Sequence, residues 1–115
     1  MRDDWTVVST DKVALKRPGE PKATYTVIGV ARTADGKAVA MNTRYSDAAG
    51  TDYVMRVYDC EAAKLFTVGS GVTFEAMQVY RPDTGWGDLV EGSSATMVAR
   101  VACSKIGKSL APTRS

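Results

Sequence analysis

The chain has 115 residues, a formal net charge of +2, and apolar and charged fractions of 44% and 24%. A single domain is expected, because a chain of this length buries a little under ~70% of its unfolded surface in one core. The lysines and arginines are interleaved with carboxylates. The composition therefore argues against a disordered chain, and also against nucleic-acid binding, which usually needs a concentrated basic face.

No apolar run approaches the ~20 residues that a membrane-spanning helix needs. The opening stretch MRDDWTVV has neither the basic start nor the apolar segment of a signal peptide. Two interpretations stay open. The protein is cytosolic, or it is the mature form of an exported protein in which Met1 replaces a removed leader. A lipid anchor in a full-length precursor is compatible with the second interpretation.

Most of the chain alternates with a period of two, which predicts β-strands. The stretch 23–32 is apolar on both sides and is expected to be a central strand. Asp35-Gly36 predicts a tight hairpin in which both residues have positive φ. Turn-length spacers separate the segments, so an antiparallel meander is expected. Its strands are predicted at 5–9, 12–16, 23–32, 37–45, 52–60, 65–70 and 72–80.

A loop with Pro82 and glycines follows at 81–92, and the period then changes. In SSATMVARVACSKIG the polar residues recur at helical spacing as one narrow stripe that includes Thr96. Ser93 or Ser94 is a suitable N-cap and Gly107 a suitable residue just past the end. A strand is the alternative, but it would place Val98 and Ala102 on the polar face, so a helix is predicted.

The predicted fold class is therefore α+β, with an antiparallel sheet of about six strands and one C-terminal helix packed on a face. A single domain is expected over residues 1–107, followed by a loose tail at 108–115.

The chain has two cysteines and no histidine. Cys60 ends a predicted strand, and Cys103 lies on the apolar side of the predicted helix. A disulfide between them would close a loop of more than forty residues, worth about 4 kcal/mol by the loop-entropy estimate. Two buried free thiols are the alternative, because cysteine behaves as a small hydrophobe in cores. Two cysteines without histidine do not form a standard structural zinc site, so neither a metal nor a cofactor is predicted.

An ordered set of short motifs runs along nearly the whole chain: DDW near the start, YDC at the end of a strand, a loop tryptophan ahead of GSS, and a closing helix with its cysteine. The set resembles the surface-adhesin family typified by protein E, small secreted proteins and lipoproteins of Gram-negative bacteria. The residues that carry the resemblance are Trp5, Tyr58, Asp59, Cys60, Trp86, Gly92, Ser93 and Cys103.

The resemblance implies an antiparallel sheet to which the C-terminal helix is fastened by a Cys60–Cys103 disulfide. It also implies export to the outer-membrane surface or the periplasm and, in some members, adhesion to host matrix proteins. Two features depart from the family pattern: the leader is missing, and Glu91 stands where the family often has proline.

Enzymatic chemistry has little support in the sequence. Without histidine, no histidine-based triad or dyad can form. The GKS at 107–109 lacks the first glycine of a phosphate-binding loop and follows a helix rather than a strand. The GSG at 69–71 lacks the third glycine of a dinucleotide loop and is interpreted as a turn. The chain is therefore predicted not to be an enzyme.

The candidate partner-binding residues are Arg44, Tyr53 and Arg56, which lie on consecutive predicted strands. They are placed on the sheet face that the helix leaves open, with a merely solvated face as the alternative. Trp86, between two glycines, is either an exposed binding anchor or a plug folded back over the sheet edge.

The predicted function is a non-enzymatic exported bacterial binding module, resembling surface adhesins that engage host extracellular-matrix or serum proteins. The alternative is a periplasmic accessory or inhibitor protein that binds a bacterial protein. A cytosolic protein with both thiols reduced is a third interpretation.

Overall fold

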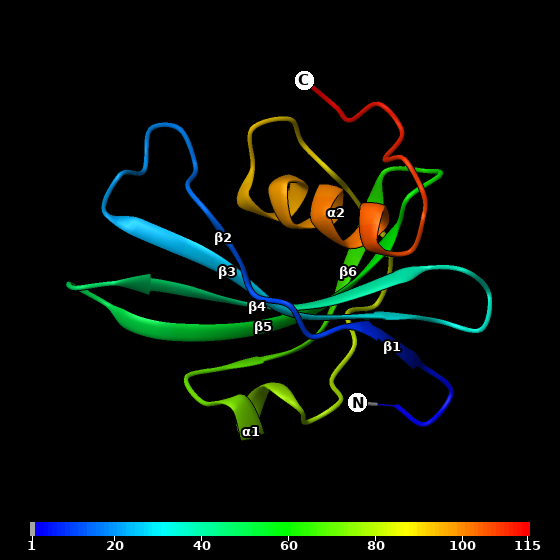
Figure 1. Cartoon of the computed structure of the whole chain (residues 1–115), viewed down its shortest axis with the longest axis horizontal. Coiled ribbons are helices and arrows are strands. Elements are labelled where there is room, and N and C mark those ends of the chain that lie inside the picture. Colours follow the sequence, from blue (N-terminus) through cyan, green and yellow to red (C-terminus); the bar gives the residue numbers. More distant parts are fainter. Residues whose placement is uncertain (1) are drawn as a thin grey trace.

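The structure is a computed structural model that describes residues 2–115. One antiparallel sheet forms the body, with a helix on each face (Figure 1). The elements are β1 Thr6–Ser9, β2 Val13–Leu15, β3 Ala23–Arg32, β4 Ala38–Ser46, β5 Gly50–Asp59, β6 Lys64–Gly71, α1 Phe74–Met77, β7 Gly87–Asp88 and α2 Ser94–Lys105.

The predicted fold class is confirmed: β3, β4, β5, β6 and β7 follow one another as a meander, and β1 and β2 both pair with the outer side of β3. The central position of β3 explains its sequence, because a strand covered on both faces must be apolar on both. Of the sheet's seven strands, β7 has only two residues and lies inside the loop predicted at 81–92.

The hairpin between β3 and β4 is confirmed, but its predicted turn type is wrong. Gly36 has φ 86°, whereas Asp35 does not have a positive φ. The Gly36 N–H donates to the Thr33 carbonyl at 3.1 Å, and the Thr33 N–H donates to the Lys37 carbonyl at 3.0 Å. The loop thus has three residues and ends on a left-handed glycine, the next most common hairpin after the two-residue type.

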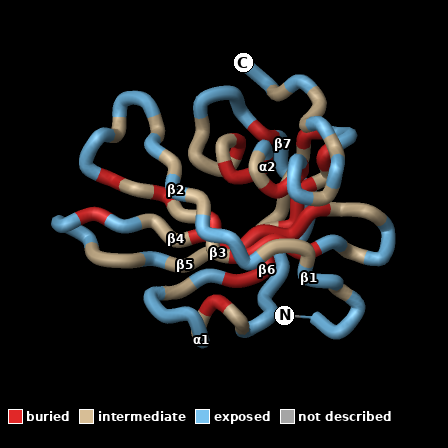
Figure 2. Tube along the Cα trace, viewed as in Figure 1, coloured by how far each residue is buried: buried red, intermediate tan, exposed pale blue. Residues whose placement is uncertain are grey.

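Two cores lie on opposite faces of the sheet, and their buried residues gather where the strands cross the helices (Figure 2). The helix-side core packs α2 on β3, β4 and β5, and alanines on both surfaces allow a close approach. These alanines are Ala38, Ala40, Ala99 and Ala102. The α1-side core includes Val39, Met55 and Met77.

The segment 72–80, predicted as a strand, instead contains α1, so that prediction is wrong. Thr73 is the N-cap of α1, and its hydroxyl accepts the Ala76 N–H at 3.1 Å. The only buried residue of the helix is Met77, which is 0% exposed in the α1-side core. The apolar residues Val72 and Phe74, which suggested a strand, are exposed.

Helix α2 begins and ends where the sequence predicts. Ser93 is the N-cap and accepts the Thr96 N–H, and Gly107 follows the helix with φ 78°. Thr96 departs from the predicted polar stripe because it is 0% exposed. Its hydroxyl donates to the Val90 carbonyl at 2.6 Å and accepts from Ser93, so it is buried with its hydrogen bonds made.

The segment 108–115 is not the loose tail that the sequence predicts. The Ala111 N–H donates to the Cys60 carbonyl at 2.8 Å, and the Arg114 N–H donates to the Leu89 carbonyl at 3.0 Å. Leu110 and Ala111 pack against the helix-side core. The side chain of Arg114 also pairs with Asp88 at 2.9 Å. The segment is therefore part of the domain.

Two carboxylates that hold this segment have lowered pKa values. Lys64 and then Arg114 lower the pKa of Asp88, while Arg100 and then Thr113 lower the pKa of Glu91. A carboxyl group whose pKa is lower in the folded state stabilises the fold above its unfolded pKa. That stabilisation is lost as the pH falls.

We therefore expect the double variant Asp88→Asn/Glu91→Gln to have a lower Tm than the wild type at neutral pH. The difference in Tm should begin to shrink as the pH falls below 4.5 for Glu91 and 3.8 for Asp88, the ordinary pKa values of these groups. It should disappear once the pH is below their lowered pKa values in the folded state. Thermal unfolding by circular dichroism between neutral and acid pH measures this. The matched control is Asp3→Asn, an exposed carboxylate outside these contacts. A difference in Tm that does not change with pH would contradict the assignment.

Candidate functional site

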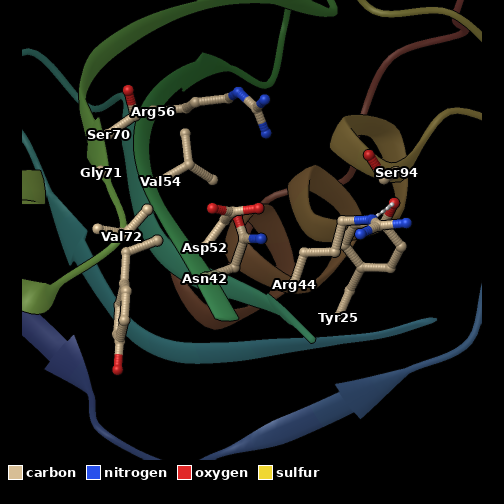
Figure 3. A pocket seen from close by; sticks show the side chains of 11 residues that line it. Tyr25, Asn42, Arg44, Asp52, Val54, Arg56, Ser70, Gly71, Val72 and Ser94 are labelled. Carbon is tan, nitrogen blue, oxygen red and sulfur yellow. Dashed lines mark hydrogen bonds between the residues drawn. The ribbon is translucent and has the colours of Figure 1, made fainter. Parts of the chain in front are cut away.

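A cavity of about 430 Å³ opens at the end of the sheet where the β4–β5 hairpin projects past α2 (Figures 1 and 3). We call it the sheet-end cavity. All three candidate strand residues contribute to its lining, Arg44 and Arg56 from the α2 side of the sheet and Tyr53 from the opposite side. Its lining residues are Tyr25, Asn42, Arg44, Asp52, Tyr53, Val54, Arg56, Ser70, Gly71, Val72 and Ser94.

The floor of the cavity is a grid of side chains set by strand register. Every second side chain of β5 points toward the α2 side of the sheet; these are Asp52, Val54 and Arg56. Arg44 of β4 lies directly opposite Asp52, and Asn42 lies opposite Val54.

Arg44 is held by the loop between β2 and β3. Its Nη2 and Nε donate to Glu20 Oε2 at 2.7 and 3.2 Å, and its Nε also donates to the Tyr25 hydroxyl at 3.2 Å. The Tyr25 hydroxyl donates in turn to Glu20 Oε1 at 2.8 Å. The hydrogen bond from Arg44, and to a smaller extent that from Tyr25, lowers the pKa of Glu20. The hydrogen bond to Glu20 in turn raises the pKa of Arg44. Arg44 therefore fastens the loop to the sheet.

Among residues 2–115, neither Asp52 nor Arg56 has a charged partner. Although Arg44 is its cross-strand neighbour, Asp52 makes no ion pair or side-chain hydrogen bond within residues 2–115. Figure 3 shows why: the Arg44 guanidinium lies beside Tyr25, away from the Asp52 carboxylate. Arg56 donates from Nε to Thr67 Oγ1 at 3.4 Å, and no carboxylate of the described chain lies within ion-pair distance of it.

Asn42 adds an unpaired acceptor to the same floor. The residue is 3% exposed, and its Nδ2 donates to the Thr43 carbonyl at 3.3 Å. Its Oδ1 is buried, and nothing in the part of the chain that the structure describes donates to it. Buried polar atoms are nearly always hydrogen-bonded, so this acceptor beneath the cavity floor is an exception among the described residues.

The prediction that Arg44, Tyr53 and Arg56 share the open face of the sheet is wrong. Arg44 and Arg56 project to the α2 side, beyond the part that the helix covers. Tyr53 is an odd number of residues from Arg56, so its side chain points to the opposite face. It packs against the α1-side core, with its ring edge-on to Phe74 and the centroids 6.4 Å apart.

Trp86 lies apart from the sheet-end cavity. Its ring meets Phe66 of β6 edge-on, with centroids 4.6 Å apart, and 43% of the residue is exposed. A second hollow of about 420 Å³ beside it is lined by further aromatic residues, including Trp5 and Tyr80. Trp86 thus packs on a strand of the sheet and is also exposed, so plug and exposed anchor both stay predictions.

Asp52 and Asn42 are site residues that the sequence analysis did not single out. The available signal was register. The turn between Ser46 and Gly50 places Asp52 opposite Arg44, and two-residue steps then place Asn42 opposite Val54.

The two cysteines form a disulfide, and its Cα atoms are 5.9 Å apart. Within residues 2–115 no helix is long and apolar enough to cross a membrane, and no group of three or more Cys, Asp or Glu side chains could hold a metal ion. The fold and site thus define a disulfide-tethered α+β domain with a charged cavity at one end of its sheet. Comparisons with protein-family models, curated proteins and solved structures found no match, so the resemblance to surface adhesins stays a prediction.

Proposed function

We propose that this protein is a non-enzymatic exported binding module that engages a protein partner through the sheet-end cavity. The observation that carries the proposal is the pair of uncommitted charges, Asp52 and Arg56, on the cavity floor. Both project from positions of β5 that are paired with β4, so their backbone is held in place before a partner arrives. Preorganised polar groups in a concave site favour binding because little freedom is lost.

The disulfide supports export. Disulfides persist in oxidising compartments such as the periplasm and the cell surface and are rare in the cytosol. The Cys60–Cys103 bridge is consistent with such an environment. Together with the resemblance to protein E-like adhesins, it supports a location at the outer-membrane surface or in the periplasm. The partner class that follows is a host matrix or serum protein, and the alternative is a bacterial periplasmic protein.

The test is Arg56→Ala, measured by surface plasmon resonance against purified matrix and serum proteins and against purified periplasmic proteins. For the partner that binds the wild type, we expect about a tenfold or greater loss of affinity, because a guanidinium bonded to a partner's carboxylate is a frequent hot spot. Arg56 hydrogen-bonds Thr67 at 3.4 Å and also interacts with the buried Tyr58 hydroxyl, so the Tm of the variant is measured beside its affinity.

The matched control is Arg32→Ala, which removes an exposed arginine from the end of β3, outside the cavity. It should leave the affinity unchanged. Wild-type affinity in Arg56→Ala, with a normal Tm, would exclude the sheet-end cavity as the binding site. Binding of a matrix or serum protein favours the adhesin, and binding of a periplasmic protein alone favours the accessory or inhibitor protein.

A further inference from the structure

We infer that the sheet-end cavity binds an extended peptide segment of opposite charges: a basic side chain against Asp52, an apolar one over Val54 and an acidic one against Arg56. The inference rests on the proposed function and names the chemistry of the partner's contact segment. It follows from the order of side chains on β5, from the bonds of Arg44, and from the two charges on the floor that no opposite charge among residues 2–115 pairs.

The order of side chains on β5 gives the charge pattern. Asp52, Val54 and Arg56 are two residues apart and face the cavity, so the floor reads acid, apolar, base. At the rise of a strand, the Cα atoms of Asp52 and Arg56 are about 13 Å apart. Figure 3 shows the Arg56 head and the Asp52 carboxylate on opposite sides of Val54.

Asp52 is open to an external cation because Arg44 is already bound. Opposite charges that face each other across two strands normally attract. Here the Arg44 guanidinium makes three hydrogen bonds to Glu20 and Tyr25 instead. These bonds hold it beside Tyr25, pointing away from Asp52 (Figure 3). A lysine or arginine from a partner would supply the cation that Asp52 lacks.

Arg56 is open to an external carboxylate. Its contact with Thr67 is long, at 3.4 Å, and uses only Nε; the Tyr58 hydroxyl, which also interacts with it, is uncharged, so the two terminal nitrogens carry a charge that no described carboxylate pairs. Those two nitrogens form a planar fork that matches the two oxygens of a carboxylate. Between the two charges, Val54 offers an apolar surface.

The separation of the two charges selects a peptide over a small zwitterion. A free amino acid carries both of its main-chain charges on one Cα and cannot reach Asp52 and Arg56 together. An extended peptide places side chains four residues apart at the same spacing of about 13 Å. A peptide of five residues with an acid, a central apolar residue and a base therefore matches the floor.

The probe is acetyl-Glu-Thr-Val-Thr-Lys-amide, titrated into the labelled full chain and followed by the amide shifts of β5 in NMR spectra. We expect shifts at Asp52, Val54 and Arg56. A peptide with Gln in place of both charged residues should bind about tenfold or more weakly, because the charged hydrogen bonds are lost. Added salt should weaken the Glu/Lys peptide and leave the neutral one unaffected.

A charge swap provides the sharper test. Asp52→Lys should lose affinity for the Glu/Lys peptide and gain affinity for a Glu/Glu peptide, each by about tenfold. Arg32→Glu, outside the cavity, should alter neither. The Tm of each variant checks the fold. Equal binding of the charged and neutral peptides, or an unchanged preference in a folded Asp52→Lys variant, overturns the inference.

The two proposals fail in different ways. If Arg56→Ala loses the protein partner while the peptides do not discriminate by charge, the binding site stands and the peptide chemistry is wrong. If the peptides behave as expected while Arg56→Ala retains the protein partner, the cavity binds charged peptides but is not the contact for that partner.

Discussion

Replacing Gly69 with alanine is expected to destabilise the domain by about 3 kcal/mol, the upper part of the usual range for overpacking a core. A Cβ atom at this position would lie 2.0 Å from the Met77 carbonyl oxygen and 3.1 Å from that of Val79. Both are backbone atoms, so no side chain can rotate away. The segment that contains α1 would have to lift from β6 and withdraw Met77 from the α1-side core.

Urea denaturation followed by circular dichroism measures the loss. The matched control is Gly87→Ala on β7, where the nearest atom to an added Cβ is Leu65 Cδ2 at 3.8 Å, an ordinary contact. It should change the free energy of unfolding by less than about 0.5 kcal/mol, as surface substitutions usually do. If Gly69→Ala is as stable as the wild type, the close packing of α1 on β6 is wrong.

The same glycine shows where sequence patterns mislead. The sequence predicts a turn at 69–71, yet these residues end strand β6. The two glycines, Gly69 and Gly71, have no side chain, which makes room for α1. The next segment alternates apolar and polar residues as a strand does. The signal for a helix was Thr73 with Glu75 in the following turn, an N-cap and an acidic first turn. A helix of four residues is too short for a helical period to appear.

The sheet and α2 could be predicted because their patterns are long and local. Strands β3, β4 and β5 have 10, 9 and 10 residues, and each pairs with the next in the chain. The cap at Ser93 and the glycine at 107 mark the ends of α2 by chemistry that depends only on neighbouring residues. Thr96 was misplaced because its burial depends on the Val90 carbonyl, six residues earlier in a loop.

The site could be predicted only in part, because it depends on contacts between distant residues. Arg44 and Arg56 are predicted site residues because they lie on adjacent strands, and both line the same cavity. Their roles differ because Glu20, which is 24 residues from Arg44 in the sequence, binds one of them and not the other. The residues 108–115 look like a free end in the sequence, but their backbone pairs with Leu89 and Cys60.

Removing the disulfide is expected to have the largest effect of all. Cys60 directly follows β5, Cys103 lies in the third turn of α2, and the two are 43 residues apart in the sequence. Closing a loop of that length restricts the unfolded chain by an amount worth about 4 kcal/mol. A domain of this size unfolds with a free energy of about 5–15 kcal/mol, so the loss is a large fraction of the total.

The variant that isolates this effect is Cys60→Ala/Cys103→Ala, which leaves neither a free thiol nor a buried hydroxyl at these two buried positions. We expect its urea midpoint to fall well below that of the wild type, and reduced wild-type protein should fall to a similar value. The protein isolated from an oxidising compartment and denatured without reductant should show no free thiol. Two reactive thiols in that measurement would contradict the bridge and remove the main structural support for export, because disulfides are rare in the cytosol.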